Sequence, residues 1–466
     1  MRKFVKKDLC NIIKQLASVN ETLLKSGDAI LQEQAHQILT DCQQSAVEIG
    51  NKIEECEGEG TESVCLLEKY CEMLYQICLN WNAQSIREKK LKNIREILNK
   101  VKNSILYQLP DSKKEVVFLP YKASMWDSLE SVWMAARDDE NCNAYVIPIP
   151  YYDKKSDGSL GEMHYEGNQY PDYVPITDWR QYSIKAQHPD IIYIHNPYDQ
   201  YNKVTTVHPQ YYSVELRKYT DELVYIPYFV CWDDVPEHFC TTMAVFYANK
   251  VILQSERVAD TYKRVYIQTL GEEQKKIEEQ TGKKNQEFWI NLQNEAERKF
   301  LPLGSPKFDK VRRTTCEEAE ERLPKEWRDL IYYSDEKGYI RRKKVLLYNT
   351  SVQALLDHKE QAIRKLKAVL DAMHHNPKVV LWWRPHPLNA STLDAMIPKI
   401  EKEYLFIVQK YRQDGWGIYD DTADLNRAIA VSDAYYGDGG SVPTLYRETH
   451  KPIMFQNYEI VSYVKA

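Results

Sequence analysis

The stretch Val379-Val380-Leu381-Trp382-Trp383-Arg384-Pro385-His386-Pro387 indicates how the C-terminal part of this chain folds. Residues 379–382 form a short apolar run, which is typical of a strand buried on both faces of a parallel sheet. The two prolines restrict the backbone that follows, so Arg384 and His386 are held at defined angles. Because open α/β sheets bind ligands beyond the carboxyl ends of their strands, we expect both side chains at a binding edge.

Similar apolar runs, each rich in Val, Ile and Tyr, continue in both directions and alternate with helical stretches. This alternation predicts βαβ units and parallel sheets. The expected strands are residues 116–119, 145–149, 191–194, 223–228, 251–254 and 300–303, and then 345–348, 379–382, 405–408, 434–436 and 452–455. The charged stretch 270–298 predicts an exposed helix. We therefore expect two Rossmann-like α/β domains, at residues 111–305 and 306–466.

Residues 1–110 have a different pattern, in which apolar residues recur at three- and four-residue spacing. Leu9, Ile12 and Leu16 begin the first such series, and breaks follow at 26–27 and 58–60. The spacing predicts an α-helical hairpin or bundle module. The module is expected either to form a homo-oligomer or dock a partner through residues 1–108, or simply to pack as an appendage on the body.

Composition excludes several classes of protein. The 466 residues carry a formal net charge of −6, which gives no electrostatic reason to expect a nucleic-acid partner. The basic N-terminus lacks the apolar core of a signal peptide, and no apolar run approaches the ~18 residues of a membrane span. The ten cysteines include no C-x-x-C pair, which favours reduced thiols and no zinc site. We expect a cytoplasmic protein, with peripheral membrane contact left open.

The segments after the C-terminal strands predict a donor site for a phosphorylated ligand. Asn349, Thr350 and Ser351 either cap the next helix or bind an anion at its start. Arg384 offers a bidentate fork to phosphate beside His386, unless the loop only caps a helix and the arginine is paired at the surface. The Asp420–Asp421 pair favours an acidic helix start over a metal site. The glycine-rich segment that follows the next strand is expected to form either a phosphate-binding loop or a plain turn. Its residues are Gly437, Asp438, Gly439, Gly440 and Ser441.

The N-terminal half is expected to hold the acceptor and the catalytic groups. His195 follows a predicted strand and is the candidate general base, with Asp199 as its orienting partner, unless hydrogen bonds merely hold this loop together. At the expected hinge between the halves, Ser305 and Lys307 would reach the donor phosphate, or Lys307 is a surface lysine. The acceptor wall is predicted from loop residues that could equally serve only for packing: Trp126, Asp127, Asn196 and Tyr228.

The C-terminal half resembles the CDP-glycerol glycerophosphotransferases that build teichoic-acid-type polymers. The resemblance rests on Gly304-Ser305-Pro306-Lys307-Phe308-Asp309, on Arg384-Pro385-His386-Pro387, and on an ordered set that runs from Asp424 through Asp438 and Ser441 to Lys451-Pro452-Ile453. It covers roughly residues 300–457, weakens over 115–299 and is absent over 1–110. It implies a GT-B fold with no metal or cofactor, with the CDP-linked donor near Arg384, His386, Asp438 and Ser441.

Two departures from the family pattern bear on the activity. The family's His-Gly-x-Pro-Leu-Lys loop corresponds here to residues 225–230, which contain no histidine, and its Asp-Tyr-Ser-Ser segment is Asp438-Gly439-Gly440-Ser441. The base would then be His195, or the acceptor differs, or transfer activity has been lost.

The expected function is transfer of a glycerol-phosphate, or a related polyol-phosphate or sugar unit, from a nucleotide-activated donor. CDP-glycerol is the first choice of donor. The acceptor would be a hydroxyl of a polymer or lipid-linked chain in cell-wall or surface polymer synthesis, at the inner face of the membrane. The alternative is a catalytically degenerate GT-B protein that acts as a scaffold or regulator through its helical N-terminus.

Overall fold

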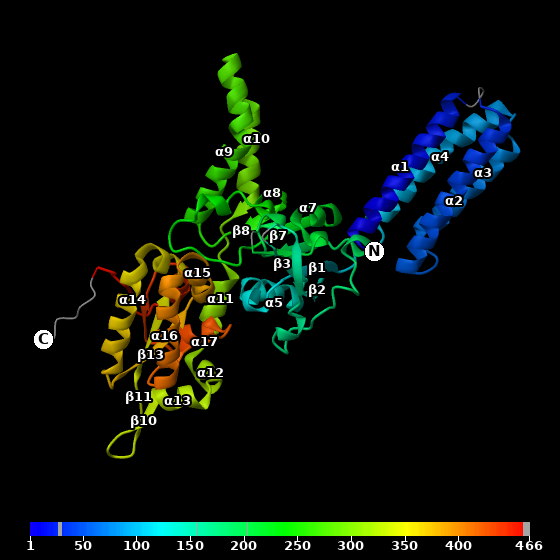
Figure 1. The fold of residues 1–466 in the computed structure, drawn as a ribbon. Helices are drawn as coiled ribbons and strands as arrows, with labels where there is room; N and C mark the ends of the chain where they lie inside the picture. The colour runs from blue at the N-terminus through cyan, green and yellow to red at the C-terminus, as the bar shows by residue number, and fades with distance from the viewer. Residues whose placement is uncertain (27–29, 156, 203, 460–466) are drawn as a thin grey trace. The chain divides into compact units, whose positions relative to one another are not determined.

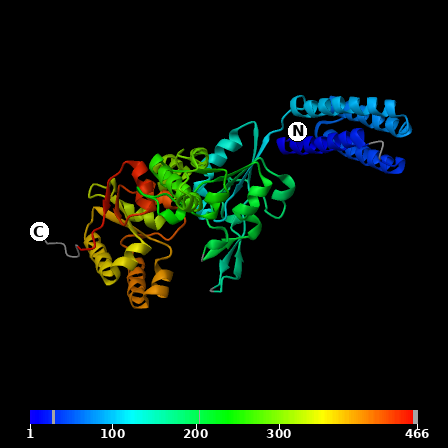
Figure 2. The same cartoon turned by 90° about the horizontal axis from the view of Figure 1, so that it is seen from above.

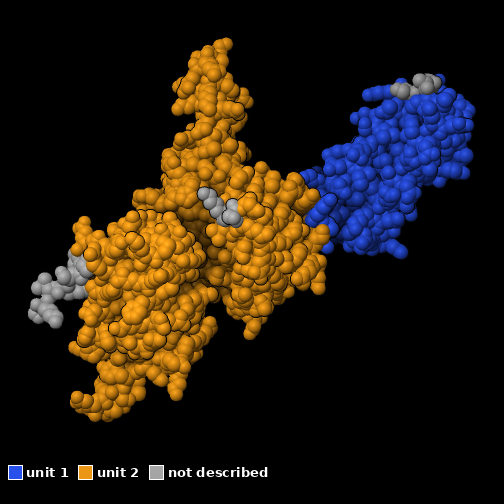
Figure 3. All heavy atoms as spheres, in the orientation of Figure 1, with its two compact units in different colours: residues 1–116, 137–143, 185–191 blue, residues 117–136, 144–184, 192–466 orange. Residues whose placement is uncertain are grey.

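The computed structural model describes residues 1–26, 30–155, 157–202 and 204–459. Its contacts divide the chain into two compact units, coloured separately in Figure 3. The first unit comprises Met1–Val116, Arg137–Asn143 and Lys185–Ile191, and the second comprises Val117–Ala136, Ala144–Ile184 and Ile192–Ala466. Among the described residues, no helix combines the length and the apolar character needed to cross a membrane. All ten cysteines are free thiols, as predicted.

The first unit contains the predicted helical module, in which long helices lie beside one another (Figures 1 and 2). Apolar residues at helical spacing fill its interior, and Tyr70 and Ile94 are completely buried. A polar contact also crosses the interior: the Asn20 amide nitrogen donates to the Tyr70 hydroxyl over 3.0 Å. The predicted helix break at 26–27 falls partly on Gly27, which lies outside the described residues. The helices are α1 (Lys3–Ser26), α2 (Gln32–Glu57), α3 (Glu62–Leu79) and α4 (Gln84–Tyr107).

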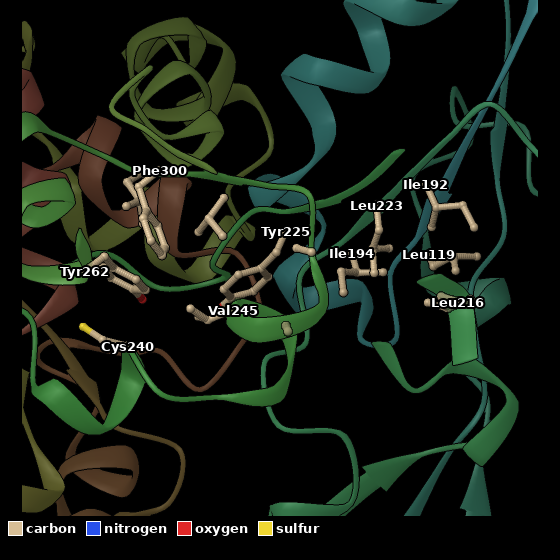
Figure 4. Packing of buried hydrophobic residues seen from close by; sticks show 14 of the residues in the cluster. Leu119, Ile192, Ile194, Leu216, Leu223, Tyr225, Cys240, Val245, Tyr262 and Phe300 are labelled. Carbon is tan, nitrogen blue, oxygen red and sulfur yellow. The ribbon is translucent and has the colours of Figure 1, made fainter. Parts of the chain in front are cut away.

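The first α/β sheet has the strand order β2-β1-β5-β7-β8-β9. Its strands are β1 (Lys114–Leu119), β2 (Cys142–Val146), β5 (Ile191–Ile194), β7 (Glu222–Tyr225), β8 (Lys250–Ile252) and β9 (Phe300–Leu301). Residues from the strands and covering helices form one apolar core, part of which is drawn in Figure 4. Tyr225, Tyr262 and Phe300 are fully buried there. Short helices connect the strands: α5 (Glu130–Asp138), α6 (Ile184–Gln187), α7 (Ser213–Leu216) and α8 (Met243–Tyr247).

A small antiparallel sheet that the sequence analysis did not predict accompanies this domain. It has the order β4-β3-β6, built from β3 (Tyr151–Lys154), β4 (Leu160–His164) and β6 (Thr205–Val207). The three strands are short and rich in polar residues, so none has the apolar run by which the other strands were recognised.

The charged stretch predicted as one exposed helix is instead a helical hairpin. It consists of α9 (Glu256–Thr281) and α10 (Gln286–Lys299), which lie side by side in Figure 1. Gly282 ends α9 in the left-handed conformation, which glycine adopts without strain. A Cβ atom on Gly271 would stand 2.4 Å from the Trp289 ring, so glycine allows the two helices to approach.

The second α/β sheet is parallel, with the order β14-β13-β12-β15-β16. Its strands are β12 (Lys344–Thr350), β13 (Val379–Pro385), β14 (Ile418–Tyr419), β15 (Ala434–Gly437) and β16 (Ile453–Phe455), and a separate hairpin pairs β10 (Tyr332–Ser334) with β11 (Ile340–Arg342). The fold class is therefore the predicted one, with two parallel α/β sheets after a helical module. The helices of this second α/β domain are α11 (Pro306–Arg313), α12 (Cys316–Glu321), α13 (Lys325–Ile331), α14 (Val352–His374), α15 (Asn389–Met396), α16 (Pro398–Asp414), α17 (Leu425–Val431) and α18 (Ser441–Tyr446).

One predicted strand is wrong. Residues 405–408 lie inside α16, where Tyr404, Ile407 and Tyr411 are buried at helical spacing. Leu405 and Phe406 are exposed, so the four consecutive apolar residues do not form a buried run. The strand in this position is β14, which has only two residues.

Candidate functional site

Three segments that are distant in sequence meet at the carboxyl edge of the second sheet. β12 lies between β13 and β15, and Asn349 at its end is in register with Arg384 on one side and with Gly437 on the other. The predicted donor residues therefore come from three adjacent strand ends.

Residues 349–351 serve mainly to hold this edge together. The Asn349 amide donates to the Arg384 carbonyl over 2.8 Å. The Ser351 hydroxyl accepts from the Ala354 N–H over 3.1 Å, which makes it the N-cap of α14. Thr350 is buried, and its hydroxyl oxygen accepts from the Trp383 indole. Of the two roles considered for this segment, capping is the one observed.

The Asp438 carboxylate also holds the edge, through neutral donors. It accepts hydrogen bonds from the Ser351 N–H at 2.6 Å, from the Tyr458 hydroxyl at 2.6 Å and from the Gln456 amide. Among the described residues, no lysine or arginine forms an ion pair with it. Three donors on one buried carboxylate fix the direction of the loop that follows it.

The loop after Asp438 presents open backbone. Gly439, Gly440 and Ser441 are exposed, and within the described part of the chain their N–H groups donate no hydrogen bond. Gly440 has φ of 128°, and a side chain built on Gly439 or Gly440 would meet nothing within 4 Å. Gly437 is tightly packed, because a Cβ atom there would lie 2.3 Å from the Asn349 oxygen. Successive free N–H groups of this kind make an anion-binding concavity.

His386 and Asp438 flank the same turn. The His386 N–H donates to the Thr350 carbonyl over 2.9 Å, next to the Ser351 N–H that Asp438 accepts. The His386 side chain is exposed, and its Nδ1 accepts from the Leu388 N–H over 3.2 Å. This hydrogen bond leaves Nε2 as the ring nitrogen that carries the proton and can donate to a ligand.

Arg384 does not present the free guanidinium fork that was expected. Its Nη1 donates to the Asp420 carboxylate over 2.6 Å, and its Nη2 donates to the Thr422 carbonyl. Asp420 is completely buried and also accepts from the Trp382 indole over 3.0 Å. The charge of Arg384 is thus paired inside the protein with that of a buried carboxylate. Asp420 is neither the predicted helix start, since Asp424 caps α17, nor a group open to a metal.

His195, the candidate general base, is enclosed in this structure. The side chain is 0% exposed, its Nε2 accepts the Tyr121 N–H over 3.1 Å, and its Nδ1 lies 2.9 Å from the Ser128 hydroxyl. Because Nε2 accepts, the proton is on Nδ1 and is donated to Ser128. Burial, together with the positive charge of Lys307, lowers the pKa of His195 from 6.5 to about 3. His195 is therefore a neutral structural histidine that cannot reach a substrate hydroxyl.

Asp199 is not the orienting partner of His195. Its buried carboxylate accepts from the Ser213 N–H over 2.9 Å and from the Ser213 hydroxyl over 2.6 Å. Burial raises the pKa of Asp199 from 3.8 to about 6, because the hydrogen bonds from Ser213 only partly compensate for the lost hydration. The alternative of a loop held together by hydrogen bonds is the one observed.

The hinge lysine is paired with a residue that was assigned to the acceptor. Lys307 Nζ donates to both oxygens of Asp127, at 2.6 and 2.7 Å, and thereby links α11 to the loop after β1. Ser305 caps α11, as its hydroxyl accepts from the Lys307 N–H. Lys307 and Asp127 thus neutralise each other's charge in this arrangement.

The remaining acceptor candidates are largely buried. Trp126 and Asn196 have little exposed surface, and Trp126 packs against Tyr170. Tyr228 is half-buried and meets the His195 ring edge to face at 6.3 Å. These residues form packing around the loop ends, which was the alternative considered for them.

A cavity that the sequence analysis missed lies in the second unit. Its volume is about 510 Å³, and its lining includes Arg257, Arg312 and Arg447 together with Asp233, Asp309 and Glu448. Trp232 also lines it and packs against Phe455, which is in register with Gly437. The cavity therefore adjoins the edge that carries the open loop. The sequence predicted this cavity only indirectly. Residues that follow the strands β8 and β9 line it, but its arginines belong to no recognisable sequence motif.

The comparisons with known proteins found no match to any family model and none among curated proteins. Among solved structures, the UDP-GlcNAc 2-epimerase of Methanocaldococcus jannaschii is 10% identical, over 73% of this chain and 83% of that chain, with a TM-score of 0.41. The wall teichoic acid polymerase TagF is 14% identical, over 80% and 78%, with a TM-score of 0.41. The trehalose 6-phosphate synthase of Burkholderia multivorans is 12% identical, over 75% and 87%, with a TM-score of 0.35. The chemistry of this chain therefore has to follow from its own residues.

Proposed function

We propose that this protein is a transferase that moves a glycerol-phosphate, or a related polyol-phosphate or sugar unit, from a nucleotide-activated donor to a hydroxyl acceptor. CDP-glycerol is the proposed donor, and a polymer or lipid-linked chain of the cell wall or surface is the proposed acceptor. The donor would lie at the carboxyl edge of the second sheet, and the acceptor would enter the adjoining cavity.

The observation that carries this proposal is the open backbone of Gly439, Gly440 and Ser441 beside the exposed ring of His386. Free N–H groups and a donor at His386 Nε2 suit the oxygens of a diphosphate. Asn349, Ser351 and Asp438 support this loop from behind rather than contacting the ligand. Arg384 contributes by fixing the edge through Asp420 and not through its own charge.

In the proposed reaction, the acceptor oxygen attacks the phosphorus atom that carries the glycerol. The bond from that phosphorus to the oxygen bridging the two phosphates breaks, and the nucleoside monophosphate leaves with the electron pair. The N–H groups at 439–441 and His386 would stabilise the charge on the departing phosphate, which is electrostatic catalysis. The acceptor proton passes to a group other than His195, because both nitrogens of that ring are engaged.

The decisive test is calorimetric titration of the full-length protein with CDP-glycerol, other nucleotide-linked donors and the free nucleotides. Gly439→Val should abolish the binding seen with wild type while leaving the melting temperature unchanged, since a Cβ atom there meets no other atom within 4 Å and the added methyl groups stand over the open N–H groups. His386→Ala should weaken binding by about tenfold, as expected for one charge-assisted hydrogen bond, whereas the matched exposed His375→Ala should not. If no nucleotide binds the wild-type protein, the proposal fails.

The scaffold or regulator function remains the second candidate, and the burial of His195 favours it. An enzyme of this type needs a group to accept the hydroxyl proton, and the expected one is enclosed. The helical module also forms most of a separate compact unit, which suits a docking role. The two candidates differ in cells that carry Gly439→Val in place of the wild-type protein. Normal polymer synthesis there would support the scaffold, and its loss would support the transferase.

A further inference from the structure

The small sheet β4-β3-β6 gathers a histidine and two carboxylates on one face. Glu162 and His164 are two residues apart on β4, so their side chains point to the same side. Asp153 lies on the neighbouring strand β3, between the register pairs Tyr152–Met163 and Lys154–Leu160. The possible ligand atoms of these three residues all lie within 4.8 Å of one another.

The charges of this group leave a place for a cation. Asp153 and Glu162 lie on two paired strands with carboxylate oxygens within 4.8 Å of each other, and two negative charges at this separation repel. Among the described residues, no lysine or arginine forms an ion pair with either carboxylate, and the one basic partner is His164 Nε2, at 2.8 Å from Asp153 Oδ2. A single histidine therefore faces two carboxylates, and even a protonated ring would cancel only one of the two negative charges.

The histidine is also held in place from behind. Its ring stacks on the Tyr151 ring, with the centroids 5.1 Å apart and the planes inclined by 28°. Tyr151 is itself fixed, because its hydroxyl donates to Glu166 over 2.7 Å. Support of this kind sets the orientation of a metal-binding imidazole before the ion arrives.

We propose that Asp153, Glu162 and His164 bind a divalent transition-metal ion of the zinc class. Carboxylate oxygens and an imidazole nitrogen are ligands that such ions accept, at distances of about 2.0–2.2 Å. Two ligands on one ion are then separated by at most about 4 Å, so a small rotation of the exposed carboxylates closes the site. Three protein ligands leave at least one position for water or for an oxygen of another molecule.

The metal site is independent of the proposed transferase function. It lies on the three-stranded sheet that accompanies the first α/β domain, whereas the open loop lies on the second sheet.

The test is calorimetric titration of the chelator-treated, full-length protein with Zn²⁺. Because the chain has ten free cysteines, Co²⁺ is added in parallel, and its absorbance distinguishes thiolate ligands from nitrogen and oxygen. We expect one Zn²⁺ equivalent at a site where the Co²⁺ spectrum lacks thiolate bands. His164→Ala and Glu162→Gln should each weaken Zn²⁺ binding by more than about tenfold. Removing a residue that only supports a metal ligand already costs at least about tenfold in affinity, and removing a ligand itself costs more.

His375→Ala is the matched control. His375 lies 3.8 Å from Asp371, and among the described residues no third histidine, cysteine or carboxylate joins them in a possible metal cluster. This variant should bind Zn²⁺ like wild type. The proposal is overturned if the wild-type protein binds no Zn²⁺, if the Co²⁺ spectrum shows thiolate ligation only, or if His164→Ala and Glu162→Gln bind as tightly as His375→Ala. Glu162→Gln keeps the size of the side chain, so misfolding cannot account for its loss.

Discussion

Replacing His195 with glutamine tests whether this residue is a neutral structural group. Glutamine carries an oxygen to accept the Tyr121 N–H and an amide to donate to Ser128, the two partners of the histidine ring. Unlike histidine, it binds no proton between pH 3 and pH 8. The substitution therefore removes titration at position 195 while it keeps an acceptor and a donor there.

The expected change in the free energy of unfolding follows from the pKa of His195, which is lowered from 6.5 to about 3. Below pH 6.5 the unfolded chain binds a proton at this residue that the folded chain does not bind. The stability contributed by His195 is therefore complete above pH 6.5 and is lost as the pH falls toward 3, by about 1.4 kcal/mol per pH unit. Between pH 7 and pH 5 the loss amounts to about 2 kcal/mol.

Asp199 acts in the opposite direction over part of this range. Its pKa is raised from 3.8 to about 6, so the folded chain binds the additional proton and stability falls as the pH rises from 3.8 toward 6. The two residues partly cancel in the wild-type profile. The difference between wild type and His195→Gln removes the contribution of Asp199, because both proteins contain it.

The assay is urea unfolding at pH 7 and pH 5, followed by tryptophan fluorescence, for wild type, His195→Gln and the exposed control His375→Gln. Wild type and His375→Gln should each lose about 2 kcal/mol more than His195→Gln on going to pH 5. Equal losses in all three proteins would refute the conclusion that His195 is buried and neutral. A His195→Gln variant that keeps its stability at both pH values but loses transfer activity would restore His195 as a base.

Two further predictions concern the edge of the second sheet. Arg384→Ala should lower the free energy of unfolding by about 1.5–3 kcal/mol, because it removes the 2.6 Å partner of the buried Asp420 carboxylate and leaves Arg427, at 4.0 Å, as its remaining ion-pair partner among the described residues; adding Asp420→Asn should recover part of this loss. Urea unfolding of the single and double variants measures it, and a fully stable Arg384→Ala protein would mean that the guanidinium is free for a ligand. Gly437→Ala should lower the melting temperature because its Cβ would lie 2.3 Å from a backbone oxygen, whereas Gly439→Ala should not. Equal melting temperatures would contradict this packing.

Local features of the sequence predicted local features of the structure. The apolar run 379–382 lies in β13, and Ser351 caps the helix that follows its strand. These features depend on neighbours within four residues, which the sequence lists directly. The strand predicted at 405–408 was wrong because four apolar residues are too few to distinguish a strand from part of a helix.

The roles of the charged side chains depended on residues far away in the chain. His195 contacts Tyr121 and Ser128, which lie 74 and 67 positions earlier. Arg384 meets Asp420 36 positions later, and Lys307 meets Asp127 180 positions earlier. The position of a polar residue in a loop after a strand predicts that the residue lies at the sheet edge. It does not predict whether another segment of the chain will neutralise the charge of that residue or bury its side chain.

The sequence by itself determined that residues 349–351, 384–386 and 437–441 lie at strand ends, because alternating apolar runs and caps define those ends. Only the tertiary structure decided which of these groups remain available to a ligand. Arg384, which was expected to bind phosphate, forms an ion pair with the buried Asp420, whereas the glycine loop and the His386 side chain remain exposed. The physical reason is that a charge buried on folding needs a counter-ion or hydrogen-bond donors within the protein, and those partners are set by packing rather than by position in the chain.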